Sequence, residues 1–202
     1  MSMSASFLDR ITQLYRSFIQ HDATQSDHLK RYRNIKPDSA QYIAMLIRIQ
    51  QSKSILEIGT STGYSSLWMA DALQVTQGKM TTVEIEAERS AEAKSYAQEL
   101  KLDHLINYYV GDAKDYLAAQ QHQKFDLILL DAERNAYASY WPYLQEMFNF
   151  SGGVLIVDKV ISHALEVKDF IELVKQDPRF MTATLQLGAG LFIVTPKSQC
   201  PE

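Results

Sequence analysis

The 202-residue chain has only one cysteine, Cys200, two residues from its C-terminal end. A disulfide framework or a cysteine-based metal site within the chain is therefore excluded, as is typical of a reducing cytoplasm. The chain also lacks an apolar run long enough to span a bilayer, and it begins without the basic and apolar segments of a signal peptide. We therefore expect a cytoplasmic protein that does not bind membranes.

Basic residues are too few and too dispersed to form a basic stripe. Lysine and arginine number 20 against 24 acidic residues, for a net charge of −4, so nucleic acid is not a favoured partner. Hydrophobic residues make up 46% of the chain, enough to build a core, and the length fits one domain. With no repeat or linker, we predict a single domain over 1–202, with N-terminal helices in 1–50 and an α/β core in 53–196.

Apolar residues near the N-terminus recur at helical spacing and predict an amphipathic helix. Its apolar face must pack on the domain or on a second subunit. Residues 21–36 are polar and are expected to be irregular, and Pro37 opens a second helix. The apolar positions of the first helix are Phe7, Ile11, Leu14, Tyr15, Phe18 and Ile19.

From residue 53 onward, strand and helix patterns alternate. The fourth and fifth strands are almost wholly apolar, which is typical of a parallel sheet buried on both faces. Two further strands, 180–185 and 191–195, have no helix between them and are expected to pair as an antiparallel hairpin. The other predicted strands are 53–58, 80–85, 105–110, 125–131 and 153–158, and the predicted helices are 63–74, 87–100, 112–121, 136–148 and 163–176.

The stretch 54–65 organises the chain. An apolar strand carries Glu57, then Gly59 and Gly63 follow at a spacing of four among hydroxyl residues, and a helix begins. The glycines permit a tight turn and close approach, and the free N–H groups of the helix point toward the loop. A dinucleotide-binding loop has a third glycine, which is missing here. The carboxylate of Glu57 suits a cationic ligand. The alternative interpretation is that this turn is purely structural and binds no ligand.

Acidic residues stand at or near the ends of the other strands. Glu84 ends the second strand and can accept both hydrogens of a ribose diol, with Glu86 as the competing candidate. Asp131 and Asp158 end neighbouring strands. Two carboxylates meeting in a cleft repel each other, so one must be protonated or a cation such as Mg²⁺ must lie between them. Taken singly, each acid could instead cap a helix or face solvent.

Together these motifs resemble the caffeoyl-CoA/catechol O-methyltransferase-like proteins, especially their small bacterial members. The resemblance extends from about Pro37 to Thr195, through the stretches 56–65, 111–113, 125–137, 152–158 and 177–180. It implies a Rossmann-like class I methyltransferase sheet, mostly parallel with a C-terminal antiparallel hairpin and helices on both faces, a homodimer, and a divalent metal (Mg²⁺ or Ca²⁺) at Asp131 and Asp158. It also implies S-adenosylmethionine contacts at Ile35, Glu57, Gly59, Thr60, Ser65, Glu84, Ala113 and Asp131.

Three positions depart from the family's pattern. The asparagine that follows the second metal-binding aspartate is Lys159 here, and an ammonium cannot bind a metal. The lysine three residues after Asp131 is Arg134, which stays protonated and cannot be a general base. A Gly-Asp-Gly near the C-terminus is Gly-Ala-Gly at 188–190. The ammonium of Lys159 either takes the place of the metal's charge, where it would stabilise an oxyanion, or points to solvent.

We therefore expect an S-adenosylmethionine-dependent O-methyltransferase that acts on a catechol-like or phenol-like hydroxyl of a small molecule and needs no metal. Asp131, Lys159 and Arg134 are its predicted catalytic residues. The alternatives are a cofactor-binding protein that has lost catalysis, a dinucleotide-dependent oxidoreductase, and an N-methyltransferase of RNA or amines. The sequence does not place a general base, and for His163 and Tyr137 a surface or packing role is the more typical one.

Overall fold

The computed structural model describes residues 4–27 and 30–197, so Cys200 lies outside the described residues. Within these ranges, no helix is long and apolar enough to cross a membrane. The helices are α1 (Ala5–Thr24), α2 (Pro37–Gln50), α3 (Tyr64–Thr76), α4 (Ala87–Glu99), α5 (Ala113–Gln120), α6 (Tyr137–Leu144) and α7 (Ala164–Gln176), with short 3₁₀ turns η2 (Asp103–Leu105) and η3 (Arg134–Ala136). The strands are β1 (Ser54–Ile58), β2 (Lys79–Glu84), β3 (Ile106–Val110), β4 (Leu127–Leu130), β5 (Val154–Asp158), β6 (Phe180–Leu185) and β7 (Leu191–Pro196).

All seven strands join one sheet in the order β3-β2-β1-β4-β5-β7-β6. Strands β1 to β5 pair in parallel, whereas β7 runs antiparallel between β5 and β6. The predicted parallel sheet with a C-terminal antiparallel hairpin is therefore confirmed. Because the chain order reverses between β1 and β4, the carboxyl ends of these strands flank a crevice, which is where open α/β sheets bind ligands.

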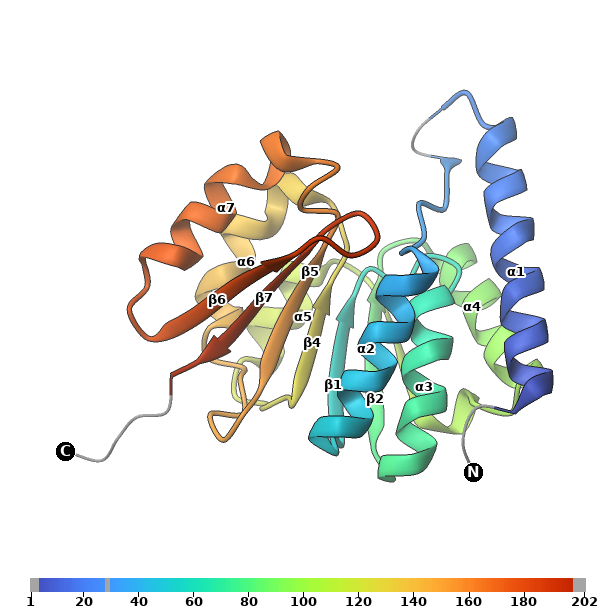
Figure 1. The fold of residues 1–202 in the computed structure, drawn as a ribbon, viewed down its shortest axis with the longest axis horizontal. Coiled ribbons are helices and arrows are strands. Elements are labelled where there is room, and N and C mark those ends of the chain that lie inside the picture. The colour runs from blue at the N-terminus through green and yellow to red at the C-terminus, as the bar shows by residue number, and fades with distance from the viewer. Residues whose placement is uncertain (1–3, 28–29, 198–202) are drawn as a thin grey trace.

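Helices cover both faces of the sheet, as predicted (Figure 1). Helices α1 to α4 pack on one face with Ile55 of β1 and Leu129 of β4. Helices α5 to α7 pack on the other face with the alternate residues, Leu56 and Ile128. Since successive strand residues point to opposite faces, both sets are apolar and buried, which explains the nearly unbroken apolar runs of the central strands.

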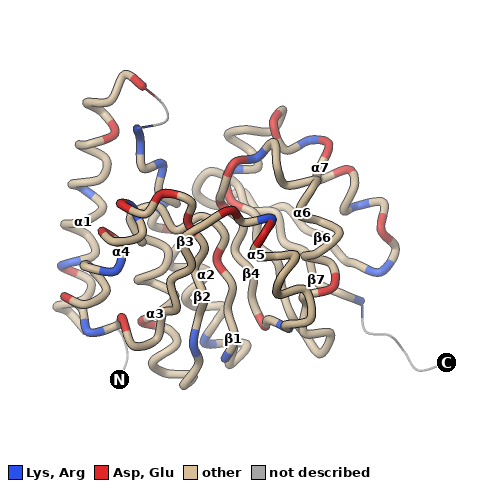
Figure 2. The backbone as a smooth tube through the Cα atoms, turned by 180° about the vertical axis from the view of Figure 1, so that it is seen from behind, with Lys and Arg blue, Asp and Glu red and all other residues tan. Residues whose placement is uncertain are grey.

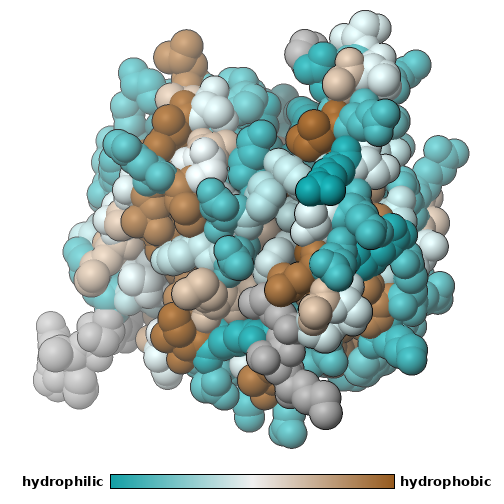
Figure 3. All heavy atoms as spheres, turned by 45° about the vertical axis from the view of Figure 1, so that its right-hand side comes forward, coloured by the Kyte–Doolittle hydropathy of each residue, from teal (hydrophilic) through white to brown (hydrophobic). Residues whose placement is uncertain are grey.

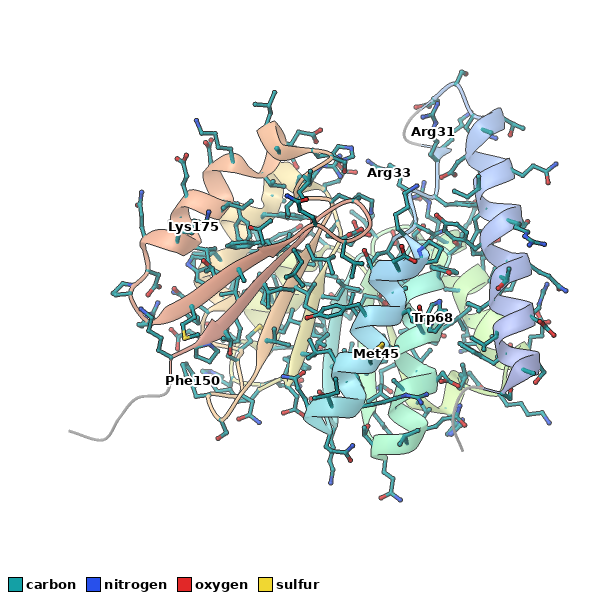
Figure 4. The ribbon with its side chains drawn as sticks, in the orientation of Figure 1. Arg31, Arg33, Met45, Trp68, Phe150 and Lys175 are labelled. Atoms are coloured by element: carbon teal, nitrogen blue, oxygen red, sulfur yellow. The ribbon has the colours of Figure 1, made fainter. Side chains whose placement is uncertain are left out.

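Helix α1 packs on the domain itself. It begins at the N-cap Ser4, whose hydroxyl accepts the N–H of Phe7 at 3.1 Å. The ring of Phe7 contacts Trp68 of α3 edge-to-face at 5.5 Å, and Phe18 contacts Tyr96 of α4 at 5.7 Å. Figure 4 labels Trp68 in the layer next to α1. Phe7, Ile11, Leu14 and Phe18 of the apolar stripe are thus buried within the chain, whereas Ile19 is 46% exposed.

Candidate active site

A cavity of about 460 Å³ opens at the carboxyl edge of the sheet. The ends of β1, β2, β4 and β5 contribute to its walls, together with the segment 32–35 that precedes α2. Figure 2 shows acidic and basic positions interleaved along this edge. Nine of the predicted site residues line the cavity, namely Ile35, Gly59, Thr60, Ser65, Glu84, Ala113, Asp131, Arg134 and Lys159. Among the described residues that line it, neither Glu57 nor Asp158 is found.

The turn between β1 and α3 lies directly against the end of β4. Gly59 has a φ of +99°, and a Cβ at this position would collide with the carbonyl oxygen of Asp131. Gly63 has a φ of +81° and packs against Ala93 of α4. Both glycines are therefore required by backbone conformation and by close approach. The result is that the turn and Asp131 share one wall of the cavity.

Glu57 is fully buried and holds this turn in place. The hydroxyls of Ser65 and Ser66 each donate to one of its carboxylate oxygens, and the hydroxyl of Thr82 donates to Oε2 at 2.6 Å. Burial raises the pKa of Glu57 to about 7, and the three hydroxyl donors oppose that rise. The observed contacts of Glu57 therefore tie β1 to α3 and β2, while its direct contact with a cofactor stays a prediction.

Glu84 presents a fixed carboxylate to the cavity from the end of β2. Its Oε2 accepts the N–H of Ser61 at 2.8 Å, and its Oε1 accepts the N–H of Glu86 at 3.0 Å. Each oxygen can accept one further hydrogen bond, so the pair can bind the two hydroxyls of a diol. Glu86, the competing candidate, is exposed at the N-cap of α4.

The segment before α2 covers the cavity from the α1 side. The carboxylate of Asp22 accepts the N–H of Tyr32 at 2.7 Å. The hydroxyl of Ser61 donates to the carbonyl of Tyr32 at 2.8 Å, and the amide of Asn34 donates to Thr62 at 2.9 Å. From sequence, only Ile35 of this segment was predicted to line the site. Nothing local in a polar, irregular stretch indicates that it folds back over a glycine turn.

A salt bridge joins this segment to the loop after β4. Arg33 has a φ of +51°, and its Nη2 lies 2.6 Å from Oε1 of Glu133. Figure 4 labels Arg33 above the carboxyl edge of the sheet, whereas Arg31 lies nearer the end of α1. Sequence reasoning missed both members of this pair, because 100 residues separate them in the chain.

Lys159 turns inward and bridges the two aspartates. It follows β5 with a φ of +64°, and its Nζ lies 2.6 Å from each carboxylate oxygen of Asp131. The same Nζ lies 3.2 Å from Oδ2 of Asp158. Burial raises the pKa of Asp158, and the nearby Asp131 adds to this effect while Lys159 opposes it. Of the two orientations left open by the sequence, the structure has the one in which the ammonium faces the carboxylates.

This arrangement does not fit a divalent metal. The ammonium already contacts both oxygens that Asp131 would offer to a metal, and its positive charge would repel one. In the part of the chain that the structure describes, no group of three or more His, Cys, Asp or Glu side chains could hold a metal ion. The two carboxylates predicted as metal ligands are instead bridged by Lys159.

Arg134, Tyr137 and His163 lie around this end of the cavity. The Nε of Arg134 donates to Glu166 of α7 at 2.8 Å. The hydroxyl of Tyr137 accepts the N–H of Ala132 and donates to the Ala132 carbonyl, both at 3.0 Å. Burial raises the pKa of Tyr137 well above its ordinary value, so this residue braces the loop rather than acting as a base. Among the described residues that line the cavity, His163 is not found.

Comparison with known proteins identifies related sequences and folds. A sequence model of a family described as O-methyltransferase matches residues 9–197. A catechol O-methyltransferase from Niastella koreensis is 29% identical over 131 residues, which span 63% of this chain and 58% of that protein.

Two crystal structures share the fold. An O-methyltransferase from Bacillus cereus in complex with SAH has 24% identity, a TM-score of 0.78, and coverage of 96% of this chain and 92% of that one. The O-methyltransferase TomG from Streptomyces achromogenes in complex with SAM has 25% identity, a TM-score of 0.77, and coverage of 94% and 89%.

Proposed function

We propose, because the chain belongs to the O-methyltransferase family, that it transfers a methyl group from S-adenosylmethionine to a small-molecule hydroxyl of catechol or phenol type without a divalent metal. The observation that carries the proposal is the ammonium of Lys159 held 2.6 Å from both oxygens of Asp131. The family supports the reaction, and the lysine supports the metal-free form. The alternative of a dinucleotide-dependent oxidoreductase is not supported by the family match.

The residues of the cavity fit the proposed cofactor. Glu84 would bind the ribose diol through the free acceptor positions of its two oxygens. Ile35 and Ala113 line the same cavity and offer apolar contact. When bound, S-adenosylmethionine supplies a methyl group made electrophilic by the sulfonium. The SAM complex of TomG, which is 25% identical over 94% of this chain, supports the same assignment.

Lys159 would orient the acceptor and stabilise its anion. Methyl transfer requires the acceptor oxygen to lie in line with the bond from sulfur to the methyl carbon. The oxygen forms the new bond as that bond breaks, and the bonding electrons stay on sulfur. An ammonium has three donors, and two of those on Lys159 contact Asp131. The third faces Oδ2 of Asp158 at 3.2 Å, and donation to the acceptor oxygen would replace this longer contact. That hydrogen bond would lower the pKa of the acceptor hydroxyl and let its proton pass to water.

Methyl transfer from labelled S-adenosylmethionine to a panel of catechols, before and after chelation with EDTA, tests the proposal. We expect the rate of methyl transfer to be unchanged after chelation, because the cation in the site is the ammonium of Lys159, which EDTA does not remove. A loss of transfer that Mg²⁺ restores would contradict the metal-free form. Cofactor binding with no transfer to any acceptor would support the second candidate, a binding protein without catalysis, which the bridged aspartates also favour.

Lys159→Asn is the matched variant for this test. The amide restores an oxygen ligand beside Asp158 and removes the competing charge. We expect calorimetry to detect Mg²⁺ or Ca²⁺ binding to the variant only. Equal metal affinity in the unmodified protein would show that Lys159 does not exclude the ion.

We also propose that the chain forms a homodimer in the cytoplasm and that its acceptor is not a nucleic acid. Most of the α1 stripe is buried within the chain, so other apolar side chains would supply much of the interface. Met45 and Ile49 of α2, with Phe150 and Met181 near β6, are exposed. Figure 3 shows exposed apolar side chains in several separate groups, and Figure 4 labels Met45 and Phe150. Sedimentation as a monomer at micromolar concentration would exclude the dimer.

A further inference from the structure

We propose that the methyl acceptor carries an anionic group in addition to the hydroxyl that is methylated, and that the guanidinium of Arg134 binds this group. The inference rests on the proposed function, since it concerns the acceptor of the same cavity. It assigns Arg134 to substrate specificity.

The side chain of Arg134 is largely buried at the cavity wall and is held by an ion pair. Its side chain is only 9% exposed, and its Nε donates to Glu166 at 2.8 Å. Arg134 nevertheless lines the cavity. In the described part of the chain, no hydrogen-bond partner is found for its two Nη groups. A planar pair of fixed donors matches a carboxylate, which can accept two parallel hydrogen bonds.

The acid that holds Arg134 does not cancel its charge within the cavity. Glu166 belongs to α7 and is 53% exposed, and it is not among the described residues that line the cavity. Water therefore screens the carboxylate of Glu166 more strongly than the buried guanidinium. The positive charge of Arg134 consequently acts mainly toward the enclosed side, where the acceptor would lie.

Two further cations reach the same end of the cavity from separate segments of the chain. Lys159 follows β5, and Arg33 precedes α2 and pairs with Glu133, which also lines the cavity but is 60% exposed. The neighbouring His163 responds to this group. Burial and then the charge of Arg134 lower its pKa, Glu166 opposes this effect, and Lys159 and Arg33 lower the pKa further. Each of the three cations has a carboxylate partner, but the partners of Arg33 and Arg134 are exposed, whereas those of Lys159 are buried or nearly so. The site proposed for an anion therefore depends on the remaining donors of Arg134.

The anion belongs to the acceptor rather than to the cofactor because of where Arg134 lies. It stands three residues after Asp131, at the end of the cavity that carries Lys159, whereas Glu84 marks the cofactor end on β2. An acceptor oxygen bound at Lys159 would have its remaining substituents next to Arg134. The competing source of a carboxylate is the amino-acid part of S-adenosylmethionine, and the experiment separates the two.

The test is calorimetric titration of the protein, saturated with S-adenosylhomocysteine, with dihydroxybenzoates and the isosteric dihydroxybenzamides. Both the 2,3- and 3,4-isomers are used, with methyl-transfer rates in parallel. We expect at least one benzoate to bind about 10-fold or more tightly than its amide, as hydrogen bonds to a charged group allow. Arg134→Gln should bring this ratio close to one, and Arg134→Lys should keep part of it.

Lys175→Gln is the control, because it removes one positive charge from an exposed position of α7 away from the cavity (Figure 4). This variant should keep the wild-type ratio. The inference is overturned by equal affinities in the wild type, by binding of no probe, or by a preference that persists in Arg134→Gln. It is also overturned if Arg134→Gln weakens binding of S-adenosylhomocysteine and leaves the ratio intact. Absence of cofactor binding and of methyl transfer would instead contradict the proposed function.

Discussion

The two halves of the sheet edge, β1 with β2 and β4 with β5, hold their carboxylates in different ways. On the β1 and β2 side, Glu57 and Glu84 accept hydrogen bonds from neutral hydroxyls and backbone N–H groups. On the β4 and β5 side, Asp131 and Asp158 face the ammonium of Lys159. Neutral donors fix the shape of a site, whereas a side-chain cation can interact with charge that develops during a reaction. The first side is suited to hold a cofactor and the second to carry out chemistry.

Removing the cation should have the largest effect on stability. Lys159→Met leaves Asp131 and Asp158 close together and without a counter-charge, which should lower the free energy of unfolding by about 3 kcal/mol. Denaturant unfolding measures this loss. Adding Asp158→Asn to Lys159→Met should recover part of it, because a neutral amide needs no ammonium. If the single variant is as stable as the wild type, the bridge contributes nothing.

On the β1 and β2 side, where Glu57 accepts hydrogen bonds from neutral donors, stability should depend on pH. Burial raises the pKa of Glu57 from 4.5 to about 7, so the folded state binds a proton more tightly than the unfolded chain. Its contribution to stability is therefore complete below pH 4.5 and is lost as the pH rises to about 7. The wild type should lose roughly 3 kcal/mol more over this range than Glu57→Gln. Thermal unfolding at several pH values checks this, and parallel curves would contradict it.

The cofactor side is tested by its diol acceptor. Glu84→Ala should weaken S-adenosylmethionine binding by about 1–3 kcal/mol, because a buried diol loses its charged acceptor. Glu86→Ala, which alters the exposed neighbour, should leave the affinity nearly unchanged. Calorimetry with both variants decides between the two acids, and a reversed order would move the diol site to Glu86.

The smallest effect is expected from the exposed salt bridge across the cavity mouth. Arg33 and Glu133 are 33% and 60% exposed, so solvent screens their attraction. Glu133→Gln should change the free energy of unfolding by less than about 1 kcal/mol, and added salt should reduce even that difference. If Glu133→Gln lowered the free energy of unfolding as much as Lys159→Met, solvent exposure would not explain the difference between the Arg33–Glu133 pair and the Lys159 bridge.

The fold could be predicted because its signals are local. Apolar periodicity, the glycine turn at Gly59 and Gly63, and the acids at strand ends depend on neighbouring residues in the chain, and the structure contains the predicted strands and helices. The strands that carry Glu84 and Asp131 bring both residues to the same cavity.

The rest depends on tertiary contacts that no local pattern encodes. The contact of Glu57 with the cofactor stays a prediction, and its hydrogen bond from Thr82, a residue of the next strand, could not be predicted from the sequence. The orientation of Lys159 depends on its positive φ and on Asp131, 28 residues earlier. Arg33 lines the cavity because its N–H donates to Asp22, and because the hydroxyl of Ser61 donates to the carbonyl of the preceding residue.

We propose that Lys159 occupies the place that a divalent metal would take. The most direct test of this proposal is a crystal structure of the protein with S-adenosylhomocysteine and Mn²⁺, an ion that takes the same oxygen ligands as Mg²⁺ and scatters anomalously. We predict density for the Lys159 side chain between Asp131 and Asp158, with no anomalous peak there. A Mn²⁺ peak between the two aspartates, with Lys159 turned outward, would contradict the account.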